Sequence, residues 1–230
     1  MKAQRLRFRY RVTGAGCALT QRELIHAWEQ AVADAGLTLA YSEGKRRTAQ
    51  IAMAAPLPQN VTSDGELVEM YLAEPVAPQE ALERMRGRLP GGIEVCDVQE
   101  IGVQAPSLQS QLRWAEYEAE LPPEVDCAGA RRAVEELLNA RTLPAEYRRE
   151  TRVKQYDLRP LVLDLRVEES GGRLVLKMRL RAEPEMTGRA DQVLVALGLP
   201  EASHIHRRRL YVDEVQAALL GYRRANEPEA

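Results

Sequence analysis

The chain has 230 residues, of which 45% are hydrophobic and 29% are charged, and its formal net charge at pH 7 is −2. This composition is that of a folded globular protein and excludes the loss of apolar residues that marks a disordered chain. A net charge near zero excludes a protein whose whole surface binds nucleic acid and leaves room for a local basic patch. The length fits two domains of ordinary size.

Membrane and metal chemistry have no clear signal in the sequence. No stretch is apolar over the length that a membrane helix needs, and the first twelve residues alternate charged and apolar side chains where a signal peptide has an apolar block. The cysteines, Cys17, Cys96 and Cys127, are widely separated, which is typical of reduced thiols and not of a zinc or cluster site. We therefore expect a cytoplasmic protein with no membrane contact, no metal and no other cofactor.

The first half of the chain predicts the order strand, helix, strand, strand, helix, strand. Residues 5–12, RLRFRYRV, alternate four arginines with four apolar side chains, so one strand face meets a core and the other meets solvent. Thr20 and Glu23 have the spacing of a capping box at the start of a helix that ends at Gly36. The remaining elements are predicted as strands near 37–42, 49–54, 66–74 and 93–101, and a helix that begins at Pro78.

The second half predicts the same order after a linker at 102–110, which is rich in turn residues. The predicted elements are a strand at 113–121, a helix capped by Asp126, strand material within 147–169, a hairpin turn at Gly171 and Gly172, a strand at 173–182, a helix near 189–197, a strand at 203–212 and a helix from Asp213 through Leu220.

The repeated order predicts an α+β protein made of tandem ferredoxin-like βαββαβ units, with antiparallel sheets that carry helices on one face. The predicted domains are 1–103, a ferredoxin-like domain, and 104–230, a second ferredoxin-like domain with an extra C-terminal helix.

Basic residues are the main candidates for binding. Lys45, Arg46 and Arg47 follow Gly44 in a predicted loop, where they can neutralise phosphates or simply form a solvated bend between two strands. Both interpretations stay open at this stage. The full set of predicted nucleic-acid-binding residues is Lys45, Arg46, Arg47, Arg149, Arg152, Lys154, Arg207, Arg208 and Arg209.

Other polar pairs give weaker signals. His204 and His206 lie on one side of a predicted strand, but no third metal ligand accompanies them, so we expect a pair of edge-strand histidines. Asp157 and Arg159 are two residues apart on an extended segment, where they can pair with each other or with a ligand. No nucleophile, phosphate-binding glycine loop or acid–base pair stands out, so no catalytic residue is predicted.

Aromatic positions bear on nucleic-acid recognition. RNA-recognition sheets place aromatic rings on their open face to stack bases. Phe8 and Tyr10 are in phase with Leu6 and therefore point inward. This argues against base-specific recognition on the first sheet and leaves binding to the nucleic-acid backbone.

Several separated motifs together resemble an uncharacterised family, the radical SAM-linked domain. They are AGLTLAYSEG, APLP, SDGELVEMYLAEP, LPGGIEVCDVQEI and APSL, followed by YDLRPLVLDL and RRRLYV. The resemblance implies a radical SAM protein as partner and RNA as the associated substrate. Members of the family carry His-Leu-Asp where this chain has Gln21, Arg22 and Glu23, and Phe-Asn-Pro-x-Pro where this chain has residues 45–49. The chain has no Cys-x-x-x-Cys-x-x-Cys motif and is therefore not itself the radical enzyme.

The sequence thus predicts a non-catalytic accessory module that is associated with radical SAM proteins and binds RNA or a protein partner. The alternative is an RNA-processing enzyme of the double-ferredoxin endoribonuclease type, although the glycine-rich loop near the C-terminus of such enzymes is missing. A scaffold that binds only proteins is the third hypothesis.

Overall fold

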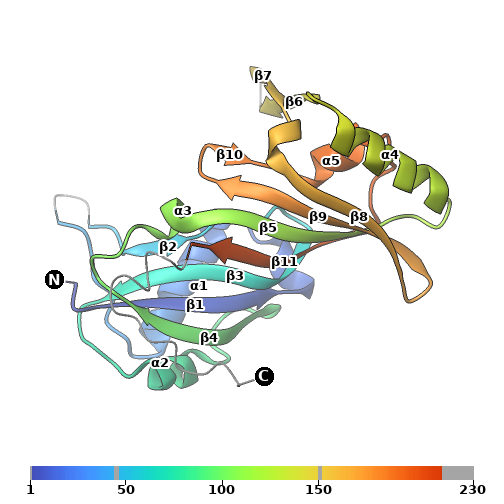
Figure 1. Cartoon of the computed structure of the whole chain (residues 1–230). Coiled ribbons are helices and arrows are strands. Elements are labelled where there is room, and N and C mark those ends of the chain that lie inside the picture. Colours follow the sequence, from blue (N-terminus) through green and yellow to red (C-terminus); the bar gives the residue numbers. More distant parts are fainter. Residues whose placement is uncertain (1, 44–46, 150–151, 214–230) are drawn as a thin grey trace, which may run out of the picture. The chain divides into compact units, whose positions relative to one another are not determined.

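The computed structural model describes residues 2–43, 47–149 and 152–213, which form two compact units (Figure 1). Unit 1 consists of the described residues of Met1–Gln59 and Asp64–Leu112, with 212–213, and unit 2 consists of Asn60–Ser63 and Arg113–Tyr211. Both units are mixed α+β, with mainly antiparallel strand pairs, which confirms the fold class at this level. The predicted C-terminal helix through Leu220 lies outside the described residues.

Unit 1 has the predicted order of elements. Its strands are hydrogen-bonded in the order β4-β1-β3-β2, with β1 antiparallel to β4 and β2 antiparallel to β3. The strand predicted at 37–42 is reduced to isolated bridges, such as Leu39 with Leu72. The elements are β1 (Gln4–Val12), η1 (Gly14–Ala18), α1 (Gln21–Asp34), β2 (Ile51–Met53), β3 (Val61–Leu72), α2 (Pro78–Met85), β4 (Ile93–Ile101) and α3 (Leu108–Gln111).

The capping box at the start of α1 is present as predicted. The backbone N–H of Glu23 donates to the Thr20 hydroxyl at 3.3 Å, and the Glu23 carboxylate accepts from the backbone N–H of Thr20 at 2.8 Å. These hydrogen bonds from Thr20 lower the pKa of Glu23. Two free N–H groups of the helix terminus are thereby satisfied, which fixes where α1 begins.

The core of unit 1 lies between one face of the sheet and helices α1 and α2. The four apolar side chains of β1 are at most 2% exposed, and Trp28 of α1 packs against two of them, with ring centroids 5.8 Å from Phe8 and 5.3 Å from Tyr10. Burial of each such large side chain stabilises the fold by about 1.5–3 kcal/mol. The inward phase predicted for residues 5–12 is therefore confirmed.

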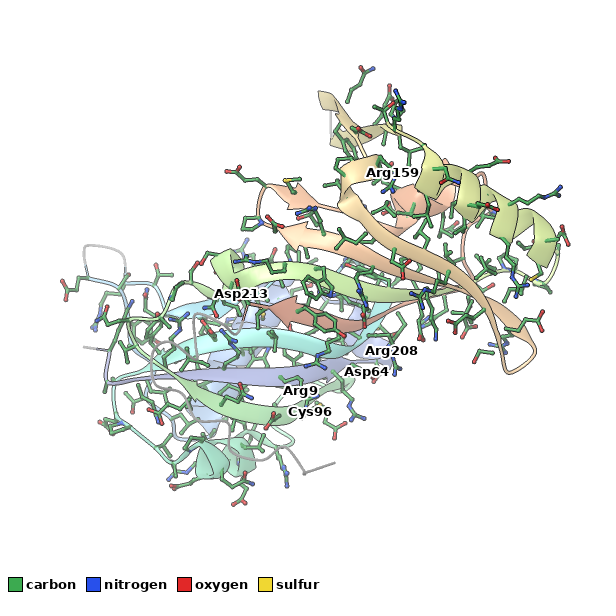
Figure 2. The ribbon with its side chains drawn as sticks, in the orientation of Figure 1. Arg9, Asp64, Cys96, Arg159, Arg208 and Asp213 are labelled. Carbon is green, nitrogen blue, oxygen red and sulfur yellow. The ribbon has the colours of Figure 1, made fainter. Side chains whose placement is uncertain are left out.

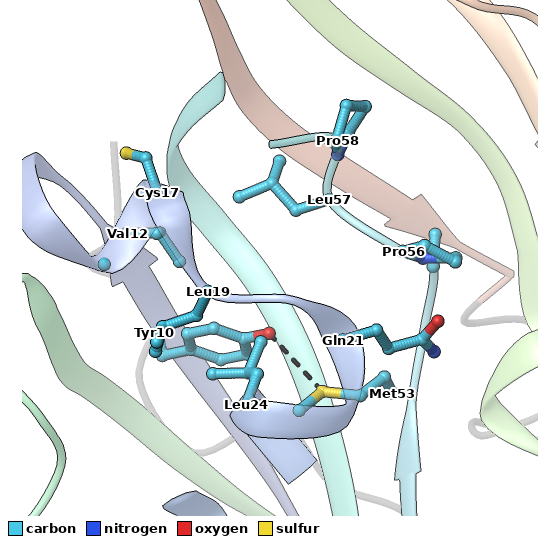
Figure 3. Close-up of a pocket in the computed structure, with 12 residues that line it drawn as sticks. Tyr10, Val12, Cys17, Leu19, Gln21, Leu24, Met53, Pro56, Leu57 and Pro58 are labelled. Atoms are coloured by element: carbon cyan, nitrogen blue, oxygen red, sulfur yellow. Dashed lines mark hydrogen bonds between the residues drawn. The ribbon is translucent and has the colours of Figure 1, made fainter. Parts of the chain in front are cut away.

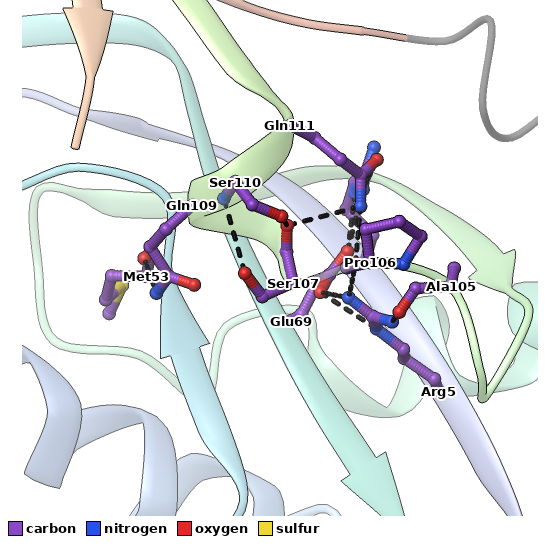
Figure 4. A network of polar contacts seen from close by, with 10 residues as sticks. Arg5, Met53, Glu69, Ala105, Pro106, Ser107, Gln109, Ser110 and Gln111 are labelled. Carbon is purple, nitrogen blue, oxygen red and sulfur yellow. Dashed lines mark hydrogen bonds and ion pairs between the residues drawn. The ribbon is translucent and has the colours of Figure 1, made fainter.

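The opposite face of β1 differs from the prediction. Arg5 and Arg7 are 1% and 7% exposed, because the segment that contains α3 covers this part of the sheet. Both guanidinium groups bind the buried carboxylate of Glu69, with Nε–Oε distances of 2.9 and 2.8 Å. Figure 4 shows the contact between Arg5 and Glu69. Arg5 also donates to two backbone carbonyls of the covering segment, at 2.6 and 2.8 Å. The expectation of a uniformly solvent-facing arginine row is thus wrong for these two residues.

Unit 2 repeats the strand order of unit 1. Its four main strands are hydrogen-bonded in the order β11-β5-β9-β8; the separate β6-β7 hairpin and the short β10 are additions. Numbered by their position along the chain, these four strands have the order 4-1-3-2, which is also the order of β4-β1-β3-β2 in unit 1. The elements are β5 (Leu112–Glu120), α4 (Cys127–Asn139), β6 (Pro144–Arg149), β7 (Arg152–Asp157), η2 (Arg159–Leu161), β8 (Val162–Ser170), β9 (Arg173–Glu183), β10 (Met186–Thr187), α5 (Ala190–Ala196) and β11 (His204–Val212).

The sheet of unit 2 has one apolar face and one polar face. Alternate residues of β5, among them Tyr117 and Ala119, are buried, as are Leu176, Met178 and Leu180 of β9. Gly171 and Gly172 have φ values of 58° and 77° and form the two-residue turn between β8 and β9, as predicted. The side chains that alternate with these core residues form the polar face of unit 2.

Candidate nucleic-acid interface

Several predicted binding residues fall outside the region whose side chains are described. Lys45 and Arg46 lie outside the described residues, and the side chains of Arg149, Arg152 and Lys154 do so as well. Arg47, which directly follows Arg46, is among the described residues. Its guanidinium carbon lies 5.6 Å from the ring centroid of Tyr41, and Tyr41 is 45% exposed. This contact is a cation–π interaction at the surface of unit 1.

The three consecutive arginines of β11 have different surroundings. Arg207 is 2% exposed and its Nη1 donates to the hydroxyl of Tyr117 at 3.3 Å, so its assignment as a phosphate-binding residue is wrong. Arg208 and Arg209 are exposed (Figure 2 labels Arg208). In a strictly alternating strand, the next buried residue after Arg207 would be residue 209. In β11 it is Leu210, so the alternation is interrupted and two successive arginines are exposed.

Asp157 and Arg159 support the fold at a corner of unit 2. The Asp157 carboxylate accepts from the backbone N–H groups of Leu143 and Arg159, at 2.7 and 3.0 Å. The Arg159 guanidinium donates to the backbone carbonyls of Leu138 and Val162, both at 2.8 Å. Backbone groups thus engage both side chains, and the role of Asp157 and Arg159 as a possible ligand pair stays a prediction.

The polar face of unit 2 alternates cations with carboxylates. The register of β5 with β9 places Glu116 opposite Arg179 and Glu118 opposite Lys177. Ion pairs on this face include Arg179–Glu116 at 3.1 Å, Lys177–Glu168 at 2.7 Å, Arg173–Glu120 at 2.7 Å and Arg208–Glu118 at 3.9 Å. Among the described residues of this face, the cations are therefore interspersed with carboxylates and do not form an uninterrupted basic stripe.

Two aromatic rings stack on the same polar face. Trp114 of β5 and Tyr211 of β11 have ring centroids 5.1 Å apart and an interplanar angle of 22°. The guanidinium carbon of Arg179 lies 5.9 Å from the Trp114 ring, and that of Arg209 lies 4.9 Å from the Tyr211 ring. We call Trp114, Glu116, Arg179, Arg209 and Tyr211 the aromatic–arginine cluster.

Glu116 joins the two ends of the aromatic–arginine cluster. Its carboxylate accepts from the Tyr211 hydroxyl at 2.9 Å and from Arg179 at 3.1 Å. Burial, together with this hydrogen bond and the charge of Glu116, raises the pKa of Tyr211, so the phenol stays protonated and acts as a donor at neutral pH. The cluster thus presents two aromatic rings and two cations held in a fixed arrangement.

Sequence reasoning overlooked this cluster although one signal was present. Trp114 shares the phase of the acidic residues of β5, so its side chain lies on the polar face and not in the core. The stacking partner, Tyr211, is 97 positions further along the chain. Only the pairing of β5 with β11 brings the two rings together.

A second polar cluster lies along β11. Thr62, at the start of β3, pairs in parallel register with His206. The Thr62 hydroxyl oxygen lies 2.7 Å from Nε2 of His204 and 2.7 Å from Nδ1 of His206. We call Thr62, His204 and His206 the histidine triad. The strand alternation places it on the same face as Arg208.

Unit 1 contains a small, mainly apolar pocket at the start of α1 (Figure 3). Its space, including the open mouth, is about 390 Å³. The Tyr10 hydroxyl contacts the sulfur of Met53 at 3.4 Å, and burial raises the pKa of the Cys17 thiol, which favours the unreactive protonated form. The other lining residues include Gln21, Leu24 and Leu57. This set of side chains offers shape and apolar contact but no acid–base chemistry.

Within the described part of the chain, no helix is long and apolar enough to cross a membrane. No group of three or more His, Cys, Asp or Glu side chains in the same residues is placed to hold a metal ion.

Comparison with solved structures found similar chains in several complexes. The structure described as a Cbf5-Nop10-Gar1 complex contains a chain with a TM-score of 0.47 and 13% identity, matched over 88% of this chain and 49% of that one. A chain of the archaeal box H/ACA sRNP Nop10-Cbf5 complex gives 0.42 and 11%, over 90% and 47%. A chain of an H/ACA RNP bound to a substrate RNA containing 2'-deoxyuridine gives 0.40 and 13%, over 87% and 46%. The protein spans about half the length of these matched chains.

A search of curated proteins found no match. A family model, described as an uncharacterized protein conserved in bacteria, matches residues 5–190, which is most of the chain. The protein therefore belongs to this bacterial family, DUF2344.

Proposed function

We propose that the protein is a non-catalytic RNA-binding module made of two ferredoxin-like units, and that it serves as an accessory to radical SAM proteins. The shared strand order of units 1 and 2 supports the tandem fold, with each unit as one domain. The radical SAM partner rests on the sequence resemblance alone. We place the RNA contact on the polar face of unit 2, where single-stranded RNA binds.

The aromatic–arginine cluster is the observation that carries this proposal. Proteins bind single-stranded RNA by combining aromatic rings, on which bases stack, with cations that contact the backbone. Trp114 and Tyr211 supply the rings, and Arg179 and Arg209 supply guanidinium groups that both contact phosphate and stack. All four groups are partly or largely exposed.

The carboxylates on the same face do not prevent phosphate binding. Ion pairs between exposed side chains are worth about 0–1 kcal/mol, so a phosphate can displace one carboxylate at small cost. The Arg179–Glu116 pair is of this kind, with side chains 48% and 30% exposed. Because cations and carboxylates alternate on this face, it should bind RNA, whose phosphates are spaced and carry bases, in preference to a polyanion without bases.

Additional phosphate contacts stay proposals from the sequence. With the buried Arg207 removed, the proposed set is Lys45, Arg46, Arg47, Arg149, Arg152, Lys154, Arg208 and Arg209.

We expect Arg209→Glu to weaken RNA binding about tenfold, because it removes one phosphate contact and adds a repelling charge. The slope of log K against log salt should become shallower by about 0.7, the value for one phosphate contact on a single strand. Fluorescence anisotropy of a labelled mixed-sequence RNA at several salt concentrations measures both quantities.

The matched control is Arg84→Glu on α2 of unit 1. Arg84 is an exposed arginine with its own ion-pair partner, Glu80, and it lies outside the proposed interface. Equal losses from Arg209→Glu and Arg84→Glu would show that only overall charge matters, which contradicts a defined site.

The same RNA should stay intact during a long incubation with concentrated protein. New fragments on a denaturing gel would overturn the non-catalytic part of the proposal and favour the endoribonuclease hypothesis.

A further inference from the structure

The histidine triad contains two titratable side chains and takes no part in the proposed stacking of RNA bases. Two ring nitrogens converge on one hydroxyl, each 2.7 Å from the Thr62 oxygen, and the imidazole centroids are 6.3 Å apart. All three side chains are partly exposed. Histidine is the side chain whose charge normally changes between pH 5 and 8.

A count of protons shows how the triad can change charge without breaking. A hydroxyl has one proton to donate and two lone pairs that accept. With both rings neutral, Thr62 donates to one ring nitrogen and accepts an N–H from the other. After one ring gains a proton, both nitrogens donate and Thr62 accepts twice. Both hydrogen bonds therefore survive the uptake of one positive charge.

Charged groups of both signs surround the triad. On β11 itself, Arg208 follows His206 on the same face. From β5, Glu118 contacts Arg208, and Glu120 lies beside the start of β11, because its carbonyl accepts from the backbone N–H of Ser203. Along β3, Asp64 is the next residue after Thr62 with the same strand phase. The charged groups near the triad are thus three carboxylates and one guanidinium group.

We propose that the histidine triad is a proton-dependent phosphate subsite of the RNA interface, adjoining Arg208. Protonation adds one positive charge to β11. Nε2 of His206 is buried, so Nδ1 of His204, which does not contact Thr62, is the ring nitrogen that can donate a charge-assisted hydrogen bond to a backbone phosphate. The subsite rests on the proposed RNA-binding function, because it extends the same face of unit 2 by one phosphate.

The first experiment measures RNA affinity at about pH 8 and about pH 5.5, which lie on either side of the range in which histidine titrates. We expect tighter binding at the lower pH and a salt slope steeper by about 0.7, the value for one extra phosphate contact. The double variant His204→Gln, His206→Gln should lose this difference between the two pH values. The chain has three histidines, and His26→Gln is the matched control, because His26 is 80% exposed on α1 of unit 1 and should leave the difference intact.

The second experiment needs no RNA and therefore separates the subsite from the function. Inorganic phosphate is added to the whole protein while NMR follows the ring protons of the histidines. We expect phosphate to shift the signals of His204 and His206 at the lower pH only, and Thr62→Val to alter their titration by removing the shared hydroxyl. Unmoved triad signals at the lower pH overturn the subsite even if RNA binds. Moved triad signals with no RNA binding at either pH sustain the subsite and reject the RNA interface.

Discussion

The two tryptophans of the chain differ in environment, which makes each a reporter for one unit. Trp28 is fully buried in the core of unit 1, whereas Trp114 is only partly buried and stacks with Tyr211 on the polar face of unit 2. The indole N–H of Trp28 has no hydrogen-bond partner within the described ranges. Replacing Trp28 by Phe therefore sacrifices packing but no hydrogen bond.

We expect RNA to quench the fluorescence of Trp114, because a stacked base changes the surroundings of its indole. Titration with RNA should quench the natural protein and the Trp28→Phe variant, and should leave the Trp114→Phe variant nearly unchanged. Circular dichroism checks that both variants are folded. Quenching that survives in Trp114→Phe and disappears in Trp28→Phe would place the contact in unit 1.

The orientation of single residues was the least predictable part of the site. Arg207, Arg208 and Arg209 are chemically identical neighbours, yet one is buried and two are exposed. A shift of one residue in a strand exchanges its faces, and the interruption of the alternation in β11 has no signature in a run of three arginines. The phase of Trp114, in contrast, was readable from its acidic neighbours.

Among the elements, β1 shows how a charged strand face becomes interior. The carboxylate of Glu69 on β3 binds both Arg5 and Arg7, and all three side chains are at most 8% exposed. Gln111 adds an acceptor for Arg7 at 3.1 Å and donates to the carbonyl of Pro106 at 2.6 Å. Two cations share one anion, so the network depends on its single carboxylate.

Glu69→Gln should destabilise the protein by about 3–5 kcal/mol, because it leaves two buried guanidinium groups without their counter-ion. Urea unfolding monitored by circular dichroism measures this loss. Glu80→Gln is the matched control, since its partner Arg84 is exposed and such pairs contribute about 0–1 kcal/mol. Similar midpoints for the two variants would show that the buried network does not hold α3 on the sheet.

The alternation of β1 was sufficient to predict its core face but not the fate of its arginines. Leu6, Phe8 and their partners follow from period two alone. Burial of Arg5 requires Glu69 and the segment at 105–106, which are 64 and about 100 residues away in sequence. A local sequence pattern does not show which distant residues will bury a strand face.

At the scale of the whole molecule, the order of elements in each unit was largely predictable. Helix caps, glycine turns and changes in the period of the hydrophobic pattern mark where the elements begin and end. The same signals could not reveal that β3 begins in unit 2, where Ser63 donates to the carbonyl of Arg207. That pairing joins residues 144 positions apart and also creates the histidine triad. The candidate site was therefore only partly predictable from the sequence. Arg208, Arg209 and the two histidines were recognised, whereas Arg179, the stacked aromatic pair and the contact with Thr62 were not.

Photo-crosslinking of the intact protein to RNA that contains 4-thiouridine tests the central claim most directly. Mass spectrometry of the digested complex then identifies which peptides carry a nucleotide. We expect crosslinked peptides from β5 and β11 that include Trp114 and Tyr211, with yields that fall as salt is raised. Crosslinks confined to unit 1, with none in β5 or β11, would contradict the assignment of the RNA interface to the polar face of unit 2.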